Sequence, residues 1–294
     1  MASQTYRTIR LTAIGSIACL PLLIFSASAA QKEKPPENLK FSRQAKAGLK
    51  NQQAKIEKEL AAGLGDEWWG EYYQGDGLGV NVTLSMAPKS GFAFTWTGCL
   101  GLYDLNYGDV VFENGRYKLQ FRYPNKREGF EGIAPELIPV RWGSRHYLIP
   151  ADDFVRFANA VNSGFEASTR SIGRRFLLKR GDGEKSVAGF PDVPVGFKPY
   201  LLASPVRAQV TSVGESKTEE NGRVTRVVLN VGTTNGVKPG MEFYVYEPST
   251  IFETAKIRSL SEHSAEAEIH QYNSKQPSPS KDWQLSTYAL TGRE

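Results

Sequence analysis

The stretch from Asp109 to Tyr123 constrains the fold more than any other part of the chain, because it has the pattern of a β-hairpin. Asn114 and Gly115 suit a type I′ turn, whose two central positions both need a positive φ. Apolar and polar residues alternate on each side of this turn, as in a sheet with one wet face. Pairing outward from the turn sets Glu113 opposite Arg116. It also predicts one apolar face made of Val110, Phe112, Tyr117, Leu119, Phe121 and Tyr123.

The first 30 residues have the pattern of a secretory signal peptide. Arg7 and Arg10 form a basic region, residues 11–25 an apolar run, and residues 26–30 a stretch of small side chains suited to cleavage. The apolar run is short for a bilayer span of ~20 residues, and Pro21 interrupts it, so cleavage is expected at Ala29 or Ala30. An uncleaved anchor is the alternative. We expect the mature protein to be periplasmic or secreted, with no further transmembrane segment.

Charge and cysteine content exclude several classes of protein. The 294 residues include 36 Lys and Arg against 31 Asp and Glu. The charged residues that signal removal takes away are all basic, so the excess of positive charge becomes smaller still. That balance is too small to argue for nucleic-acid binding. Cys19 lies in the predicted signal, so the mature chain keeps Cys99 and forms no intramolecular disulfide. Stability must therefore come from burying a core, and the length suits one large or two ordinary domains.

Residues 31–65 are expected to form a polar linker followed by an amphipathic helix. Ser42 suits the N-cap and Gly65 the end of this helix. Apolar residues recur at spacings of four and seven, at Phe41, Ala45, Leu49, Ile56, Leu60 and Leu64. A coiled coil needs a longer repeat, so we expect the helix to dock on its own domain, with a dimerisation arm as the alternative.

Residues 66–200 are expected to form a β-rich domain with one packed helix. Short strands separated by glycine-rich turns are typical of a small barrel or sandwich, and they are expected over residues 79–86, 92–97 and 145–149. Residues 151–162 carry apolar side chains at helical spacing, which predicts a helix that lies on the sheet and ends at Gly164. The glycines and prolines between residues 181 and 205 indicate a domain boundary.

Residues 201–294 are expected to form a second, smaller β-barrel. Short alternating segments are expected as strands over residues 206–213, 223–231, 242–246, 255–260, 265–270 and 283–288. The predicted class is therefore mainly β (α+β), with an N-terminal helix, a barrel or sandwich carrying one helix, and a small C-terminal barrel.

Two stretches resemble known families. Residues 230–241, NVGTTNGVKPGM, resemble the N-x-G-x-x-x-G-V-x-x-G-M turn of small β-barrel domains in bacterial envelope proteins such as rod-shape-determining protein C and flagellar assembly protein T. The resemblance implies a barrel used for assembly contacts, in which Asn235 and Gly236 turn the chain and Pro239 and Gly240 form a type II turn. Residues 66–200 are similar to uncharacterised secreted bacterial proteins with GCLG-x-YD and RWG-x-RHYLIP stretches, and this likeness implies no activity.

The strongest catalytic candidates are Cys99, His146 and either Asp152 or Asp153. A thiolate nucleophile needs an imidazole beside it, and a carboxylate can orient that imidazole. The alternative makes Cys99 a small buried hydrophobe, and makes Asp152 and Asp153 acids at the positive end of a helix. We expect no catalytic site, and keep a cell-wall hydrolase using Cys99 and His146 as the alternative. Histidine and cysteine lack the spacing of a metal site, so no metal or cofactor is expected.

A dense set of aromatic residues is the candidate binding surface. Its flat faces and polar tips suit a carbohydrate or peptide groove, and the alternative is core and barrel rim. The set is Trp68, Trp69, Tyr72, Tyr73, Trp96, Tyr103, Tyr107 and Trp142, with Asn235 added from the C-terminal turn. Arg141, Arg145, Arg174 and Arg175 suit either an anionic partner or solvated strand ends. We expect a non-catalytic protein that binds an envelope protein or a cell-wall component, with capture of a small ligand in a barrel as a further alternative.

Overall fold

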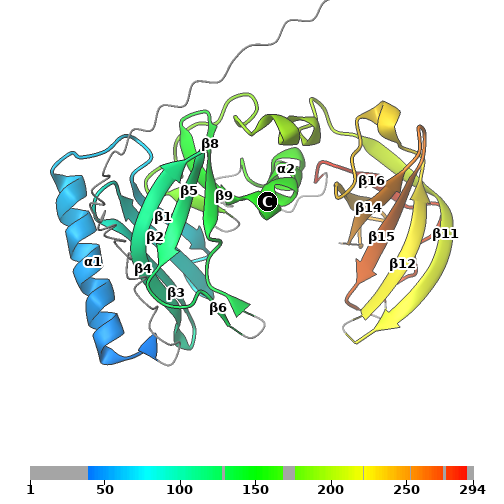
Figure 1. The fold of residues 1–294 in the computed structure, drawn as a ribbon. Coiled ribbons are helices and arrows are strands. Elements are labelled where there is room, and N and C mark those ends of the chain that lie inside the picture. Colours follow the sequence, from blue (N-terminus) through cyan, green and yellow to red (C-terminus); the bar gives the residue numbers. More distant parts are fainter. Residues whose placement is uncertain are drawn as a thin grey trace, which may run out of the picture. The chain divides into compact units, whose positions relative to one another are not determined.

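The computed structural model describes residues 39–127, 130–167, 176–220, 222–251, 253–273 and 276–289 (Figure 1). The expected signal peptide and most of the expected linker lie outside these residues, as do Arg174 and Arg175. The described chain is mainly β and carries its long helix at the N-terminal side, which confirms the predicted class. None of the helices within the described ranges is long and apolar enough to cross a membrane.

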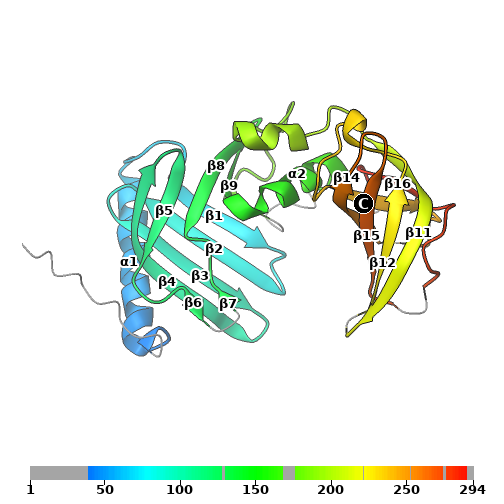
Figure 2. The same ribbon diagram turned by 45° about the vertical axis from the view of Figure 1, so that its right-hand side comes forward.

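Strands between residues 70 and 179 close into a first barrel. Every neighbouring pair is antiparallel, in the order β1-β10-β9-β8-β5-β4-β3-β2 (Figure 2). The strands are β1 Gly70–Gly75, β2 Val80–Ala87, β3 Gly91–Gly98, β4 Gly101–Glu113, β5 Arg116–Phe121, β8 Glu136–Trp142, β9 Arg145–Pro150 and β10 Leu177–Lys179. A separate two-stranded ladder joins β6 Lys126–Arg127 to β7 Phe130–Glu131. The sequence was compatible with either a barrel or a sandwich, and the structure shows a closed barrel.

The predicted hairpin is formed by β4 and β5 in the predicted register. Glu113 lies opposite Arg116, and the turn between them has φ 52° at Asn114 and 72° at Gly115. The predicted apolar face is wrong at Tyr123, and Phe112 lies on it, with its ring 4.7 Å from the Tyr117 ring between centroids, but is only partly covered. Phe112 is 52% exposed at the tip of the hairpin, and Tyr123 lies beyond the end of β5, where it packs with the residues beneath the N-terminal helix.

Gly115→Val is expected to lower the free energy of unfolding by roughly 1–3 kcal/mol, the range for strained backbone positions. At φ 72° a β-branched side chain collides with its own backbone, and no other atom lies within 4 Å of the added Cβ. Gly196→Val is the matched control, because Gly196 also has open space around it but no positive φ. Equal urea midpoints for the two variants would contradict the primed turn.

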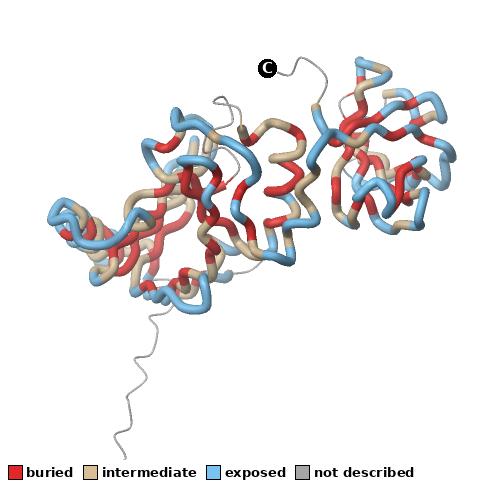
Figure 3. The backbone as a smooth tube through the Cα atoms, turned by 90° about the horizontal axis from the view of Figure 1, so that it is seen from above, coloured by how far each residue is buried: buried red, intermediate tan, exposed pale blue. Residues whose placement is uncertain are grey.

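The interior of the first barrel is filled by inward-pointing side chains from most of its strands. Figure 3 shows buried residues following the strands and exposed residues at their connections. The cluster has a fully buried part made of Tyr72, Leu84, Met86, Phe92, Phe94, Leu137 and Leu148. It is completed by residues with up to 8% of their surface exposed, namely Val110, Tyr117, Leu119, Ile133 and Leu177. The barrel is therefore a packed core and not an open lumen.

Helix α1, Arg43–Ala61, docks on the outer face of β2, β3 and β4. Ser42 caps it as predicted, since its Oγ accepts the Ala45 N–H at 3.1 Å. The helix ends four residues before Gly65, because Gly63 already adopts φ 71°. Near that end, the buried Glu59 carboxylate accepts backbone N–H groups from the β2–β3 turn, at 2.8 Å from Lys89 and 2.7 Å from Ser90. The structure thus confirms docking on the helix's own domain.

Helix α2, Phe154–Ser163, lies on the outside of β8 and β9, as predicted for a helix packed on the sheet. A short 3₁₀ turn, η2 Ala151–Asp153, precedes it, and Gly164 ends it in the left-handed conformation at φ 80°. Phe154 and Phe157 are buried against the outer side chains of β8, β9 and β10. These are Ile138, Val140, Trp142, Tyr147, Ile149, Phe176 and Leu178.

Strand β8 was missed in the sequence because Pro139 lies at its centre. Proline cannot donate to a strand ladder and usually argues against a strand. Here β8 is paired along its whole length with β9, but with β5 only at Glu136 and Leu137. Pro139 is tolerated because it lies beyond that short ladder. Strand β8 carries Arg141 and Trp142 and so decides where two candidate site residues lie.

Strands after residue 206 close into a second barrel, as predicted. Their order is β11-β12-β15-β14-β13-β16. The strands are β11 Arg207–Glu219, β12 Gly222–Leu229, β13 Glu242–Glu247, β14 Thr254–Leu260, β15 Ala265–Gln271 and β16 Gln284–Ser286, and a 3₁₀ turn, η4 Val195–Tyr200, precedes them in the chain. Strand β11 continues well past the expected end at residue 213, to Glu219.

The turn that carries the family resemblance has the expected geometry. Thr233–Asn235 forms a 3₁₀ turn, η5, and Gly236 follows at φ 76°. Gly240 has φ 84°, and the Met241 N–H donates to the Lys238 carbonyl at 3.2 Å, as in a type II turn. Asn235 Oδ1 accepts the Gly232 N–H at 3.0 Å, so this predicted binding residue has a role within its own turn.

Candidate functional site

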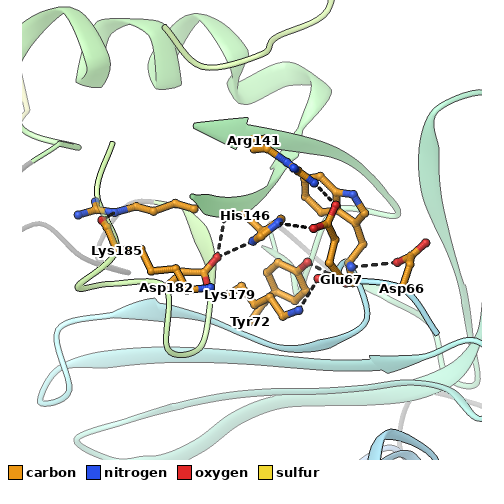
Figure 4. A network of polar contacts seen from close by, with 10 residues as sticks. Asp66, Glu67, Tyr72, Arg141, His146, Lys179, Asp182 and Lys185 are labelled. Carbon is orange, nitrogen blue, oxygen red and sulfur yellow. Dashed lines mark hydrogen bonds and ion pairs between the residues drawn. The ribbon is translucent and has the colours of Figure 1, made fainter. Parts of the chain in front are cut away.

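A buried carboxylate–imidazole pair organises one end of the first barrel, where the β8–β9 hairpin meets the turn after β10 (Figure 4). The Asp182 Oδ2 lies 2.7 Å from His146 Nδ1 and accepts the His146 backbone N–H at 2.7 Å. The other carboxylate oxygen pairs with Lys185 Nζ at 2.6 Å. His146 and Asp182 are almost entirely buried, with 7% and 1% of their surface exposed. An ionised carboxylate only accepts hydrogen bonds, so His146 Nδ1 is the protonated nitrogen in this pair.

Burial alone would raise the pKa of Asp182, but hydrogen bonds from Lys185 and from the ring and backbone of His146 outweigh it. The pKa therefore lies below its usual range. The folded state holds the ionised form more strongly than the unfolded chain does, and this difference contributes to stability wherever the carboxylate is ionised.

Stability is accordingly expected to fall as the pH drops below about 4, the ordinary pKa of an aspartate. The contribution of Asp182 is fully present above the unfolded pKa and is lost as the pH falls through the lowered folded pKa. Asp182→Asn should flatten this acid limb, which urea denaturation measured from pH 7 down to about 2.5 would show. A variant that loses stability with acid as steeply as the wild type would contradict the assignment.

The second nitrogen of His146 faces Glu67 and is closed off from solvent. Nε2 is fully buried, and its distance to Glu67 Oε2 is 3.6 Å, which is too long for a hydrogen bond. Glu67 is itself held from two sides: its carboxylate pairs with Arg141, and its backbone carbonyl accepts a hydrogen bond from Lys179. His146 thus lies beneath the segment that leads into β1.

Trp68 is fixed by three neighbours of this network. Its ring meets the His146 ring edge-on with centroids 4.9 Å apart, and the Arg141 guanidinium lies 6.0 Å from its centroid. Its carbonyl accepts the Tyr72 hydroxyl at 2.8 Å, and burial raises the pKa of Tyr72, which keeps this phenol a donor. The network therefore orients an aromatic ring and a guanidinium at the surface of the barrel.

These two side chains line an open groove of about 520 Å³. The other lining residues are Pro139, Gly143, Phe190 and Asp192. Phe190 is 53% exposed, and the Asp192 side chain is exposed as well. The Arg141 guanidinium is paired with Glu67, whereas among the described residues Asp192, which also lines the groove, has no ion-pair partner. The volume of this groove lies in the range of ordinary ligand sites. Its lining, with two aromatic residues and a few polar groups, is also typical of a binding site.

Another hollow, of about 240 Å³, lies on the outer face of the second barrel and offers less to a ligand. Its central charges already satisfy one another: Glu268 pairs with Arg258 at 2.7 Å and with Arg226 at 3.9 Å. Its lining has no aromatic ring apart from His270. We therefore take the groove at Trp68 and Arg141 as the candidate site.

The aromatic residues chosen from the sequence are spread over several environments. Trp142 is buried beneath α2, with Nε1 donating to the Gly189 carbonyl at 2.8 Å, and Tyr72 is buried inside the barrel. Trp69 and Trp96 pack at the margin of the barrel core, and Tyr103 meets Trp96 edge-on at 6.2 Å. The remaining ones also have structural partners: Tyr73 stacks with Arg180, and Tyr107 packs under α1. Of the whole set, Trp68 lines the candidate groove.

Two interpretations of charged and reactive residues need correction. Cys99 is exposed in the β3–β4 turn and not a buried hydrophobe, and its Sγ lies 3.6 Å from the Leu78 carbonyl. Arg145 is not a solvated strand end, because it is 3% exposed and its Nε donates to the Lys185 carbonyl at 2.8 Å.

The alternative catalytic set, Cys99 and His146 with Asp152 or Asp153, named the wrong carboxylate partner for His146. The carboxylate beside His146 is Asp182 and neither Asp152 nor Asp153, both of which lie in the 3₁₀ turn before α2. Asp153 is instead 3.9 Å from Arg156, one helical turn onward. Within the described ranges, no group of three or more His, Cys, Asp or Glu side chains is arranged to hold a metal ion.

Sequence reasoning missed Glu67, Asp182, Phe190 and Asp192. The last three lie in the stretch that was interpreted as a domain boundary, because its glycines and prolines follow no periodic pattern. This stretch is held against the barrel by backbone contacts. The Asp192 N–H donates to the Arg141 carbonyl at 2.7 Å, and the two residues form a β-bridge. Asp182 between two glycines has the pattern of an ordinary turn, so the sequence carried no signal of its burial.

Comparisons of the chain with protein-family models, with curated proteins and with solved structures found no match. The resemblance to envelope assembly barrels therefore stays a prediction.

Proposed function

We propose that the protein is an extracytoplasmic, non-catalytic binding protein of the cell envelope, and that the groove at Trp68, Arg141 and Phe190 holds its ligand. The observation that carries this proposal is the burial of His146 Nε2 beneath Trp68 and beside Glu67. An Asp–His pair acts as a general base only when the second nitrogen reaches the substrate. Here Trp68 and Glu67 cover that nitrogen, and the pair positions the rim of a groove.

The proposed location follows from the predicted signal peptide. Intact mass of the mature protein tests it, with loss of the residues before Ala29 or Ala30 as the expected result. Retention of the first 25 residues would show that the chain is anchored.

The second barrel is proposed to contact an envelope partner through its exposed turn at residues 233–236. Two hydrogen bonds support a rigid turn: Asn235 accepts the Gly232 N–H, and the Thr234 hydroxyl donates to the Glu262 carbonyl at 2.8 Å. Exposed turns on a rigid scaffold are common sites of partner contact. Crosslinking in the native envelope followed by mass spectrometry would identify such a partner.

Complementation of a deletion strain separates binding from catalysis. Phe190→Ala combined with Asp192→Asn is expected to abolish activity at normal protein abundance, because both residues line the groove and neither is buried. Cys99→Ala is expected to keep full activity. Loss of activity in the Cys99 variant together with an active groove variant would favour the hydrolase.

A further inference from the structure

The groove is closed to one common mode of peptide binding. Extended peptides often bind by adding a strand to a free sheet edge, where backbone hydrogen bonds supply the affinity. At the groove, β8 is paired with β9 on one side, and on the other side Arg141 is bridged to Asp192. Pro139 has no N–H to offer on this strand. A peptide therefore finds no backbone edge here.

The charges and shape of the groove also disfavour a small cation or a strongly anionic group. Cation recognition by aromatic rings gains most where the ion is desolvated, whereas this groove is open and the Arg141 guanidinium already lies 6.0 Å from the Trp68 ring centroid. An anion would meet the Asp192 carboxylate, which has no ion-pair partner within the described ranges, while the Arg141 guanidinium is already paired with Glu67. The occupant should therefore be neutral, or nearly so, and rich in hydrogen-bonding groups.

We infer that the occupant is a saccharide, an inference that rests on the proposed binding function. A sugar ring has an apolar face that can stack on the Trp68 or Phe190 ring, and its edge carries hydroxyl groups. The Asp192 carboxylate can accept from these hydroxyls, and the Arg141 guanidinium, which carries five N–H donors, can donate to them, as charge-assisted hydrogen bonds. The groove volume of about 520 Å³ lies within the range of sites that hold small ligands.

The test is isothermal titration of the mature full-length protein with a defined panel. The panel contains oligomers of N-acetylglucosamine, cello-oligosaccharides, malto-oligosaccharides and a pool of random decapeptides. At least one saccharide series is expected to bind. Phe190→Ala and Asp192→Asn should each weaken that binding about tenfold or more, which corresponds to losing one stacking contact or one charge-assisted hydrogen bond.

Phe112→Ala is the matched control, because Phe112 is as exposed as Phe190, at 52% against 53%, but lies at the tip of the β4–β5 hairpin. This variant should bind like the wild type. Binding of the peptide pool, lost in the groove variants, would overturn the saccharide and leave the binding function standing. Turnover of any panel member, or saccharide binding that the groove variants leave unchanged, would overturn the groove itself. A panel with no binder would overturn the saccharide assignment.

Discussion

Lys40→Met is expected to lower the free energy of unfolding by about 3–5 kcal/mol, because it leaves a buried carboxylate without its cation. Lys40 Nζ lies 2.7 Å from Asp104 Oδ1, and the two side chains are 1% and 0% exposed. The same ammonium group donates to the Pro124 carbonyl at 3.1 Å. Lys40 thus ties the segment before α1 to β4, and the variant loses both contacts.

The double variant Lys40→Met/Asp104→Leu is the control for this prediction. Replacing both partners of a buried pair by apolar groups is often neutral, whereas removing one partner is costly. The double variant is therefore expected to recover most of the lost stability in thermal or urea unfolding. A double variant as unstable as Lys40→Met, or a single variant as stable as the wild type, would contradict a buried ion pair at this position.

Asp182→Ala is expected to lower the free energy of unfolding by about 2–4 kcal/mol, because two buried donors of His146 lose their shared acceptor. It leaves the His146 ring and backbone N–H without the acceptor that each has at 2.7 Å, and unsatisfied buried donors carry their own cost. Because His146 supports Trp68, ligand affinity should fall as well.

Asp192→Ala, in the same loop, is the matched control for Asp182→Ala. Its side chain is exposed, and its hydrogen bond to the Arg141 carbonyl comes from the backbone, so stability should change by no more than about 0.5 kcal/mol. Its ligand affinity should nevertheless fall. Equal stabilities for the two variants would show that the Asp182 pair does not hold this end of the barrel.

The parts of the fold that were predicted correctly are those with a local signal. Asn114 and Gly115 predict the turn that they form, and Ser42 predicts the start of α1. Pro239 and Gly240 form the expected type II turn. Each of these features depends on a few adjacent residues. The end of α1 was misplaced because Gly63, and not the equally suitable Gly65, adopts the left-handed conformation that first interrupts the helix.

The candidate site could not be predicted because its residues come from segments far apart in the chain. Glu67 and Trp68 precede β1, Arg141 and His146 lie on β8 and β9, and Asp182 follows β10. Their meeting depends on barrel closure, which no periodic pattern encodes. Trp142 was predicted as a binding residue but is buried beneath α2. The sequence cannot separate a tryptophan that packs under a helix from one that lines a groove.

Native mass spectrometry of the mature protein with the saccharide panel tests the central claim most directly, because it reports binding and the chemical state of the ligand together. The account predicts a complex whose mass equals the protein plus one intact saccharide, absent in the Phe190→Ala/Asp192→Asn variant and present in Cys99→Ala. A covalent adduct or a shortened saccharide from the wild type, lost in Cys99→Ala or His146→Gln, would contradict it.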